Sequence, residues 1–151
     1  MLFDSDKDNW SENTSVFDDR LMNKTNLIFV VEDTMNNKYG GYISSSINKY
    51  NDYINDSNAF VFSLKSNGRI NGMRKFDITQ PQYAIFMYQK SNSRLFRIGG
   101  GADIGVYKKN SNSFWTNTQT SFNYEGLSGV FRGATSMTNY SLKRFTVLQM
   151  K

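Results

Sequence analysis

The sequence predicts a mostly β (α+β) fold, a two-sheet antiparallel β-sandwich with a few peripheral helices. Short runs of apolar, β-branched and aromatic residues recur along the chain, and turns rich in Asn, Ser and Gly separate them. This pattern is typical of an antiparallel fold with many short strands. Only two stretches show the apolar spacing of an amphipathic helix. The chain has 151 residues, 38% of them hydrophobic, which fits one domain, residues 1–151, with a full core.

The first half of the chain predicts three strands and two helices. Strands are expected at residues 2–3, 26–32 and 38–43, and the last two form a hairpin. Ser11 is a suitable N-cap for a helix that runs to about residue 23. Gly40 and Gly41 lie inside the second hairpin arm and indicate a bulge or the close approach of another chain segment. A second helix is expected from the spacing of Ile43, Ile47, Tyr50 and Ile54.

The second half predicts further strands at 59–64, 69–77, 83–88 and 140–150, and a central pair at 94–98 and 103–108. Between the central strands lies a glycine cluster: Gly99, Gly100, Gly101 and Gly105 are four of the eleven glycines in the chain. Such a cluster serves either a tight bend between strands or a phosphate-binding loop. The Gly-Lys-Ser/Thr of a Walker loop is missing, and a strand rather than a helix follows, which favours the bend.

The composition excludes several classes of chemistry. The chain contains neither cysteine nor histidine, so it has no disulfides, thiol nucleophiles, Cys/His zinc sites or histidine acid–base catalysis. Paired carboxylates could still cleave a glycoside, but nothing in the spacing brings two of them together, so we expect neither an active site nor a cofactor. The candidate acids are Glu32, Asp33, Asp77, Asp103 and Glu125.

The N-terminal segment carries an acidic pattern that resembles a metal site. Asp4, Asp6 and Asp8 have the alternating spacing of a calcium loop. The sixth loop position is Asn9 instead of Gly, and the twelfth is Ser15 instead of Glu, so we expect a turn and no metal. The segment also lacks the apolar core of a signal peptide, and no apolar run is long enough to span a membrane. An intracellular protein, cytoplasmic or nuclear, is therefore expected.

Positive charge is concentrated in the C-terminal part. Residues 1–56 contain ten acids and five bases (net −5), whereas residues 57–151 contain three acids and thirteen bases (net +10). Either this is a solvated basic face, or it binds anions such as nucleic acid. A nucleic-acid surface would use Arg74, Lys75, Lys108, Lys109, Lys143 and Arg144, with bases stacked on Tyr83, Tyr88, Tyr107, Phe114 and Trp115.

Several segments, taken in order, resemble the TLDc domain of the oxidation-resistance protein family. They are LFDSDKDNWS (2–11), LIFVVEDT (27–34) with YGGYIS (39–44), AFVFSL (59–64), IGGG (98–101) with IGVY (104–107), SFN (121–123) followed by Leu127-Ser128, and FTVL (145–148). The chain is similar to a divergent member. Lys108-Lys109 follow Tyr107 where the family often has an acid, Gln119 replaces a family cysteine, and Leu148 replaces a closing Trp.

The resemblance implies a two-sheet β-sandwich flanked by helices and a role in resistance to oxidative stress without an established active site. It also implies a protein partner, which for some members is the vacuolar-type proton ATPase. The contact surface is then expected at the loops 99–103, from Gly99 to Asp103, and 126–133. The glycines could instead serve the fold alone, in which case we expect Gly101 to require the left-handed backbone conformation.

Overall fold

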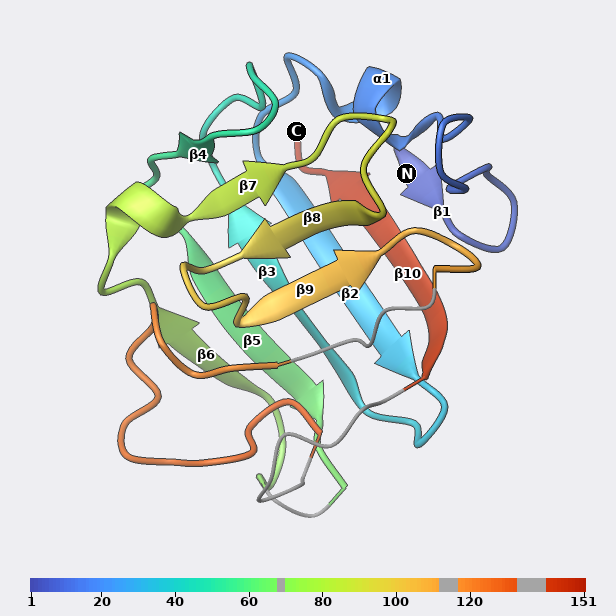
Figure 1. The fold of residues 1–151 in the computed structure, drawn as a ribbon. Coiled ribbons are helices and arrows are strands. Elements are labelled where there is room, and N and C mark those ends of the chain that lie inside the picture. Colours follow the sequence, from blue (N-terminus) through green and yellow to red (C-terminus); the bar gives the residue numbers. More distant parts are fainter. Residues whose placement is uncertain (68–69, 112–116, 133–140) are drawn as a thin grey trace.

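Alternating burial along the strands separates the chain into two facing sheets. In the computed structural model, which describes residues 1–67, 70–111, 117–132 and 141–151, a larger and a smaller antiparallel sheet lie one over the other (Figure 1). Strand β2 (Leu27–Asp33) is typical: every second residue is buried, and the residues between are half-buried. One face of each sheet therefore covers the core, as expected for a β-sandwich.

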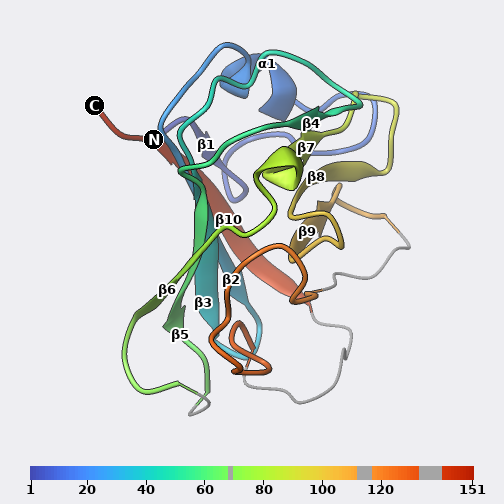
Figure 2. The ribbon, with the colours of Figure 1, turned by 90° about the vertical axis from the view of Figure 1, so that its left-hand side faces the viewer.

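The larger sheet has the strand order β1-β10-β2-β3-β5-β6, and the smaller has the order β4-β7-β8-β9. The first is built from β1 (Phe3–Asp4), β2, β3 (Lys38–Ile43), β5 (Phe60–Lys65), β6 (Arg74–Asp77) and β10 (Leu142–Gln149). The second is built from β4 (Tyr53–Ile54), β7 (Ile85–Met87), β8 (Arg94–Ile98) and β9 (Ile104–Tyr107). Figure 2 shows the two layers from the side, with the termini close together.

Aromatic rings pack against one another throughout the core, and the pair of Phe29 on β2 and Phe96 on β8 joins the two sheets. The ring centroids of Phe17 and Phe96 are 5.5 Å apart, and those of Phe29 and Phe96 are 4.9 Å apart. Phe3 stacks on Phe145 at 5.0 Å. Each pair joins segments distant in the sequence, and aromatic pairs of this kind contribute about 0.5–1.5 kcal/mol beyond their buried area.

The predicted helices were largely wrong. The first is one short helix, α1 (Phe17–Leu21), at one end of the sandwich. It cannot begin at Ser11, which forms a parallel bridge with Lys109, and Asn13 has a positive φ of 67°. A 3-10 turn, η1 (Pro81–Tyr83), precedes β7.

The predicted helix over residues 43–54 is absent. The carboxylate of Asp56 accepts hydrogen bonds from the backbone N–H of Ser44 (2.5 Å) and Ser45 (3.1 Å). The N–H of Ile47 donates instead to Lys24 O (3.0 Å). These bonds hold the segment in an irregular path that still buries Ile43 and Ile47. The apolar spacing was therefore a core signal without a helix.

Candidate interaction surface

The glycine cluster forms the turn between β8 and β9, which confirms a strand–bend–strand arrangement. The turn is fixed by Asp103, whose side chain is buried. Its Oδ2 accepts hydrogen bonds from the N–H of Thr120 (2.9 Å), the N–H of Ser121 (3.1 Å) and the hydroxyl of Tyr124 (2.5 Å). Its Oδ1 accepts from the Thr120 hydroxyl (2.7 Å). Burial, with the Asp103 charge as a smaller influence, raises the pKa of Tyr124 far above its ordinary range.

Each glycine of the turn has its own physical reason. Gly99 has a φ of +89°, and a Cβ there would lie 2.0 Å from Asp103 Oδ1. Gly101 was predicted to need the left-handed conformation, and this was wrong because its φ is not positive. A Cβ at Gly101 would instead lie 2.8 Å from the Thr120 side chain. Gly100 donates its N–H to Ser121 Oγ (2.8 Å).

The paired glycines of β3 allow close approach. A Cβ on Gly40 would lie 1.8 Å from Phe29 O, and one on Gly41 would lie 2.8 Å from Ile98 Cδ1. Gly41 is therefore where β3 meets the smaller sheet. Both glycines are buried, and at these positions they serve the fold. Of the other candidate loop, 126–133, residue 133 lies outside the described residues.

Four of the six basic residues proposed for anion binding are paired with carboxylates. Arg74 pairs with Glu125, and Lys75 lies 3.0 Å from Asp77. These two bases are on β6 at one edge of the larger sheet, whereas Lys143 and Arg144 are on β10 beside the other edge. The predicted basic surface is thus divided between opposite parts of the sheet. Lys109 is exposed.

Lys108 corrects the prediction most clearly, because its side chain is buried. Its Nζ donates to three backbone carbonyls, Gln89 O (2.8 Å), Lys90 O (2.8 Å) and Asn92 O (2.6 Å). Burial lowers the pKa of Lys108, partly opposed by the charge of Asp18. The ammonium group fixes the loop between β7 and β8 and is not open to an external anion.

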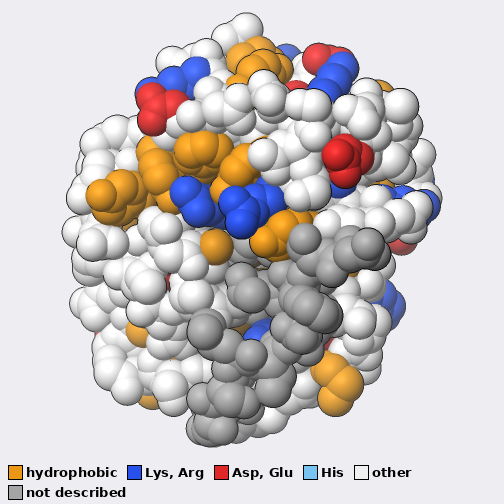
Figure 3. Space-filling view, viewed as in Figure 1, with side chains coloured by type: hydrophobic (Ala, Val, Ile, Leu, Met, Phe, Trp, Pro, Cys, Tyr) orange, Lys and Arg blue, Asp and Glu red, His pale blue; other side chains and the backbone are white. Residues whose placement is uncertain are grey.

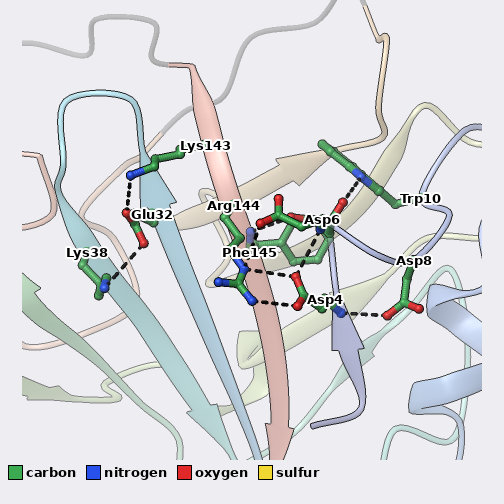
Figure 4. Close-up of polar contacts among 10 residues, drawn as sticks. Asp4, Asp6, Asp8, Trp10, Glu32, Lys38, Lys143, Arg144 and Phe145 are labelled. Carbon is green, nitrogen blue, oxygen red and sulfur yellow. Dashed lines mark hydrogen bonds and ion pairs between the residues drawn. The ribbon is translucent and has the colours of Figure 1, made fainter.

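Figure 4 shows how the acidic N-terminal segment is held against β10. The Arg144 fork donates to Asp4 Oδ1 (3.0 Å) and Oδ2 (2.7 Å), and Asp6 lies 3.3 Å from Arg144 Nε. This fork lowers the pKa of Asp4 below its ordinary value. Asp4 and Asp6 therefore join the two ends of the described chain. The alternating acids form a turn, and the positive charge beside Asp4 and Asp6 is the guanidinium group of Arg144.

The remaining candidate acids are engaged by the protein itself. Glu32 lies between Lys38 (3.4 Å) and Lys143 (2.9 Å), and its pKa is lowered chiefly by Lys143. The carboxylate of Asp33 closes the β2–β3 turn by accepting from the N–H of Met35 and from both the N–H and the side chain of Asn37. Each of the five predicted acids is thus in contact with a donor or a cation of the protein itself.

A surface that sequence reasoning identified only in part covers the outer side of the smaller sheet. Of the aromatic residues predicted to stack on bases, Tyr88 and Tyr107 belong to it, whereas Phe114 and Trp115 lie outside the described residues. Cross-strand pairing places Tyr53 beside Phe86, Phe86 beside Arg97, and Arg97 beside Gly105. A second row contains Arg94 beside Tyr107. Together with Tyr88, we call these seven residues the arginine–aromatic face: Tyr53, Phe86, Tyr88, Arg94, Arg97, Gly105 and Tyr107.

A β-bulge places both arginines on this face. Arg94 and Arg97 are three residues apart, and in a regular strand they would point to opposite sides. The register shifts between Arg94 and Phe96, so that Leu95 is the extra residue. Leu95 and Phe96 are both buried, whereas Arg94 is exposed and Arg97 is half-exposed. Bulges commonly re-aim a side chain in this way.

The guanidinium groups lie over the rings of the face. Arg97 Cζ is 5.0 Å from the centroids of both Tyr53 and Phe86. Arg94 Cζ is 5.7 Å from those of both Tyr88 and Tyr107, and its Nε donates to Tyr107 Oη (3.3 Å). These are cation–π distances. Tyr88 is only 5% exposed yet is not part of the core cluster, because the arginines help to cover it.

The arginines of this face differ from other arginines of the described chain in lacking an acidic partner. Arg20, Arg74 and Arg144 each pair with a carboxylate, whereas within the described residues neither Arg94 nor Arg97 does. The two arginines line a hollow of about 150 Å³ with Gly105 and Tyr107. Figure 3 shows basic side chains set among hydrophobic ones on this side of the molecule.

A second hollow, of about 210 Å³, lies on the larger sheet, but its Glu32, Lys38 and Arg144 are already ion-paired.

None of the helices in the described part of the chain is long and apolar enough to span a membrane.

No curated protein matches the sequence. A family model, by contrast, matches residues 1–148 of the 151-residue chain, and that model describes the TLDc domain. The match covers both sheets and the arginine–aromatic face. The chain therefore belongs to the TLDc domain family.

Proposed function

We propose that this TLDc domain is a non-catalytic protein-interaction module that regulates a partner in resistance to oxidative stress. TLDc domains form an oxidative-stress-related family. The observation that carries the proposal is the arginine–aromatic face, where Arg94 and Arg97 lie among aromatic rings without a carboxylate partner in the described chain. Arginine and tyrosine are the residue types in which binding energy at protein interfaces is concentrated.

The non-catalytic part of the proposal is supported by the engagement of the acids. Asp103 is buried and accepts four hydrogen bonds, Asp33 closes a turn, and Glu32 is held between two lysines. A catalytic acid or base must instead face a substrate with a pKa suited to proton transfer. The proposal includes a cytoplasmic location.

The partner proposed is the vacuolar-type proton ATPase, which the resemblance of the sequence implies for some family members. The experiment is binding of the purified domain to the isolated soluble sector of that enzyme by biolayer interferometry. The wild-type domain is compared with the double variant Arg94→Gln/Arg97→Gln and with Arg74→Gln. Arg74 is the matched control, because it is an exposed arginine that pairs with Glu125 on another part of the surface.

We expect the wild type and Arg74→Gln to bind alike and the double variant to lose at least about tenfold in affinity, the scale of one strong interface residue. Absence of binding by the wild type would contradict the proposed partner. Equal binding by the double variant would contradict the proposed surface. Hydrolysis of ATP by the assembled enzyme, measured with and without the domain, tests whether binding also regulates.

A further inference from the structure

We propose that the arginine–aromatic face binds an acidic segment of a protein partner, with Asp or Glu side chains of that segment accepting hydrogen bonds from Arg94 and Arg97. The inference rests on the proposed function and specifies the chemistry of the partner. It begins with the bulge at Leu95, which places two cationic groups on one face where a regular strand would place one.

The two guanidinium groups are held in position before any partner arrives. Arg97 lies over Tyr53 and Phe86, and Arg94 lies over Tyr88 and Tyr107. The rings restrict side chains that would otherwise lose considerable rotamer freedom on binding. A planar guanidinium fixed in this way presents a fork of N–H donors that matches a carboxylate.

The electrostatic requirement of the face is negative charge. Neither arginine is ion-paired in the described chain, and the Nε–H of Arg97 is buried without a hydrogen-bond acceptor. Elsewhere the protein supplies its own carboxylates, as Asp4 does for Arg144. Unlike Arg20, Arg74 and Arg144, the two arginines that line the hollow have no carboxylate in the described chain, which gives charge complementarity to an acidic segment.

The hollow has the size of a side chain. Its volume is about 150 Å³, which is the liquid volume of about five water molecules. Gly105 lies beside Arg97 in the cross-strand row, and with no side chain of its own it leaves room above the sheet. One Glu or Asp side chain fits this space, with its carboxylate between the arginines.

The rim of the face favours an apolar residue next to the acid. Tyr83 is 37% exposed and packs edge-on against Tyr53, with ring centroids 5.0 Å apart. The tyrosines offer both ring area and hydroxyl groups, a combination common at protein interfaces. An acidic segment that includes Leu or Phe would use both the charge and the rim.

Single-stranded nucleic acid fits this face less well. Base stacking needs open ring faces, and here a guanidinium lies over each of four rings, those of Tyr53, Phe86, Tyr88 and Tyr107. A phosphate backbone also needs a continuing track of cations, and the described basic residues of β6 and β10 are paired on other parts of the molecule.

The experiment measures fluorescence anisotropy with labelled 12-residue peptides. The probe alternates Glu with Leu and Phe and has an amidated C-terminus. Its matched control carries Gln at every Glu position. Three further probes test other sources of negative charge: the Gln peptide with a free C-terminal carboxylate, the Gln peptide with one phosphoserine, and oligothymidine of 12 nucleotides.

We expect the Glu peptide to bind at least about tenfold more tightly than the Gln peptide, and Arg94→Gln and Arg97→Gln each to remove most of that difference. Arg74→Gln should leave it unchanged. Circular dichroism and thermal melting of each variant confirm that it is folded. Equal affinity for the Glu and Gln peptides, or an unaltered preference in a folded Arg94→Gln/Arg97→Gln variant, would overturn the inference.

The remaining probes decide between sources of charge. Tighter binding of the free C-terminus, the phosphopeptide or the oligonucleotide than of the Glu peptide would overturn the inference in favour of that ligand. This test is separate from the proposed function. Loss of ATPase binding in the double variant together with no preference for Glu peptides overturns only the inference. A Glu preference without ATPase binding overturns only the proposed partner.

Discussion

Replacing Asp103 with Asn tests whether a buried carboxylate fixes the β8–β9 turn. Asn has the same shape but no charge. Its amide oxygen can occupy the position of Oδ2 and keep the bonds from Thr120 N, Ser121 N and the Tyr124 hydroxyl. Hydrogen bonds to a charged acceptor contribute about 1.5–3 kcal/mol, and those to a neutral one contribute about 0.5–1.5 kcal/mol. Three bonds each lose about 1 kcal/mol by this change.

A neutral amide is less costly to bury than a carboxylate, which offsets part of the loss. We therefore expect the free energy of unfolding to fall by about 2–3 kcal/mol. In a chain of this length each kcal/mol lowers the melting temperature by about 2–4 °C, so Asp103→Asn should melt about 4–12 °C below the wild type.

The assay is thermal melting by circular dichroism, with urea unfolding as a second measurement of the free energy. Asp77→Asn is the matched control, because the Asp77 side chain is 77% exposed and its ion pair in the described part of the chain is with exposed Lys75. Its melting temperature should change by no more than about 2 °C. A melting temperature for Asp103→Asn within 2 °C of the wild type, as for this control, would refute the role given to Asp103.

Three further predictions concern other buried contacts. Lys108→Met should lower the free energy of unfolding by about 3 kcal/mol or more, because three carbonyls lose a charged donor, as measured by urea unfolding. Gly40→Ala should prevent the native pairing of β2 and β3, since its Cβ would lie 1.8 Å from a carbonyl oxygen, and soluble expression with circular dichroism reads this out. Because Arg144 lowers the pKa of Asp4, the stability from this pair is present above the unfolded-state pKa of Asp and lost as pH falls through the lower folded-state pKa. Melting between pH 6 and about 2 should therefore show a steeper loss of stability in the wild type than in Arg144→Gln.

Each of these predictions has a control in the same chain. Lys109→Met changes the exposed neighbour of Lys108 and should have little effect. Gly72→Ala adds a Cβ with nothing within 4 Å, so only its positive φ of +75° is strained, at a cost of about 1–2 kcal/mol. Equal stability of the two lysine variants, a well-folded Gly40→Ala, or parallel pH curves for wild type and Arg144→Gln would contradict the corresponding argument.

Sequence pattern was sufficient for the strands because alternation is a local property. The apolar run at 26–32 and the hairpin return at 38–43 correspond to β2 and β3 within one residue. The glycine cluster predicted its bend for the same reason. The spacing of Ile43 and Ile47 wrongly predicted a helix, because a core can also accept apolar side chains from an irregular segment. The path of this segment is determined by Asp56, which lies twelve residues beyond Ser44 in the sequence.

The arginine–aromatic face could not be read from spacing alone. Arg94 and Arg97 belong to opposite faces at regular strand geometry, and the bulge at Leu95 that unites them depends on pairing with β9. Likewise, nothing local distinguishes Lys108, which is buried, from Lys109, which is exposed. One signal for this face was present in the sequence. Phe86 and Tyr88 are two residues apart on one predicted strand and so point to the same side, and Tyr107 on another predicted strand adds a third aromatic residue to that side of the smaller sheet.

The position of β10 has a consequence for how the protein acquires its structure during synthesis. The last strand of the described chain lies between β1 and β2. While the ribosome has yet to deliver residues 142–149, β2 lacks its neighbour on that side, and β1 has no partner in the sheet. The nascent chain must wait with an open sheet edge, a state that exposes it to aggregation. Folding of this domain is thus expected to be complete only after residue 149 has left the exit tunnel. The last folding step is dominated by contacts between residues far apart in the sequence, and such contacts form slowly.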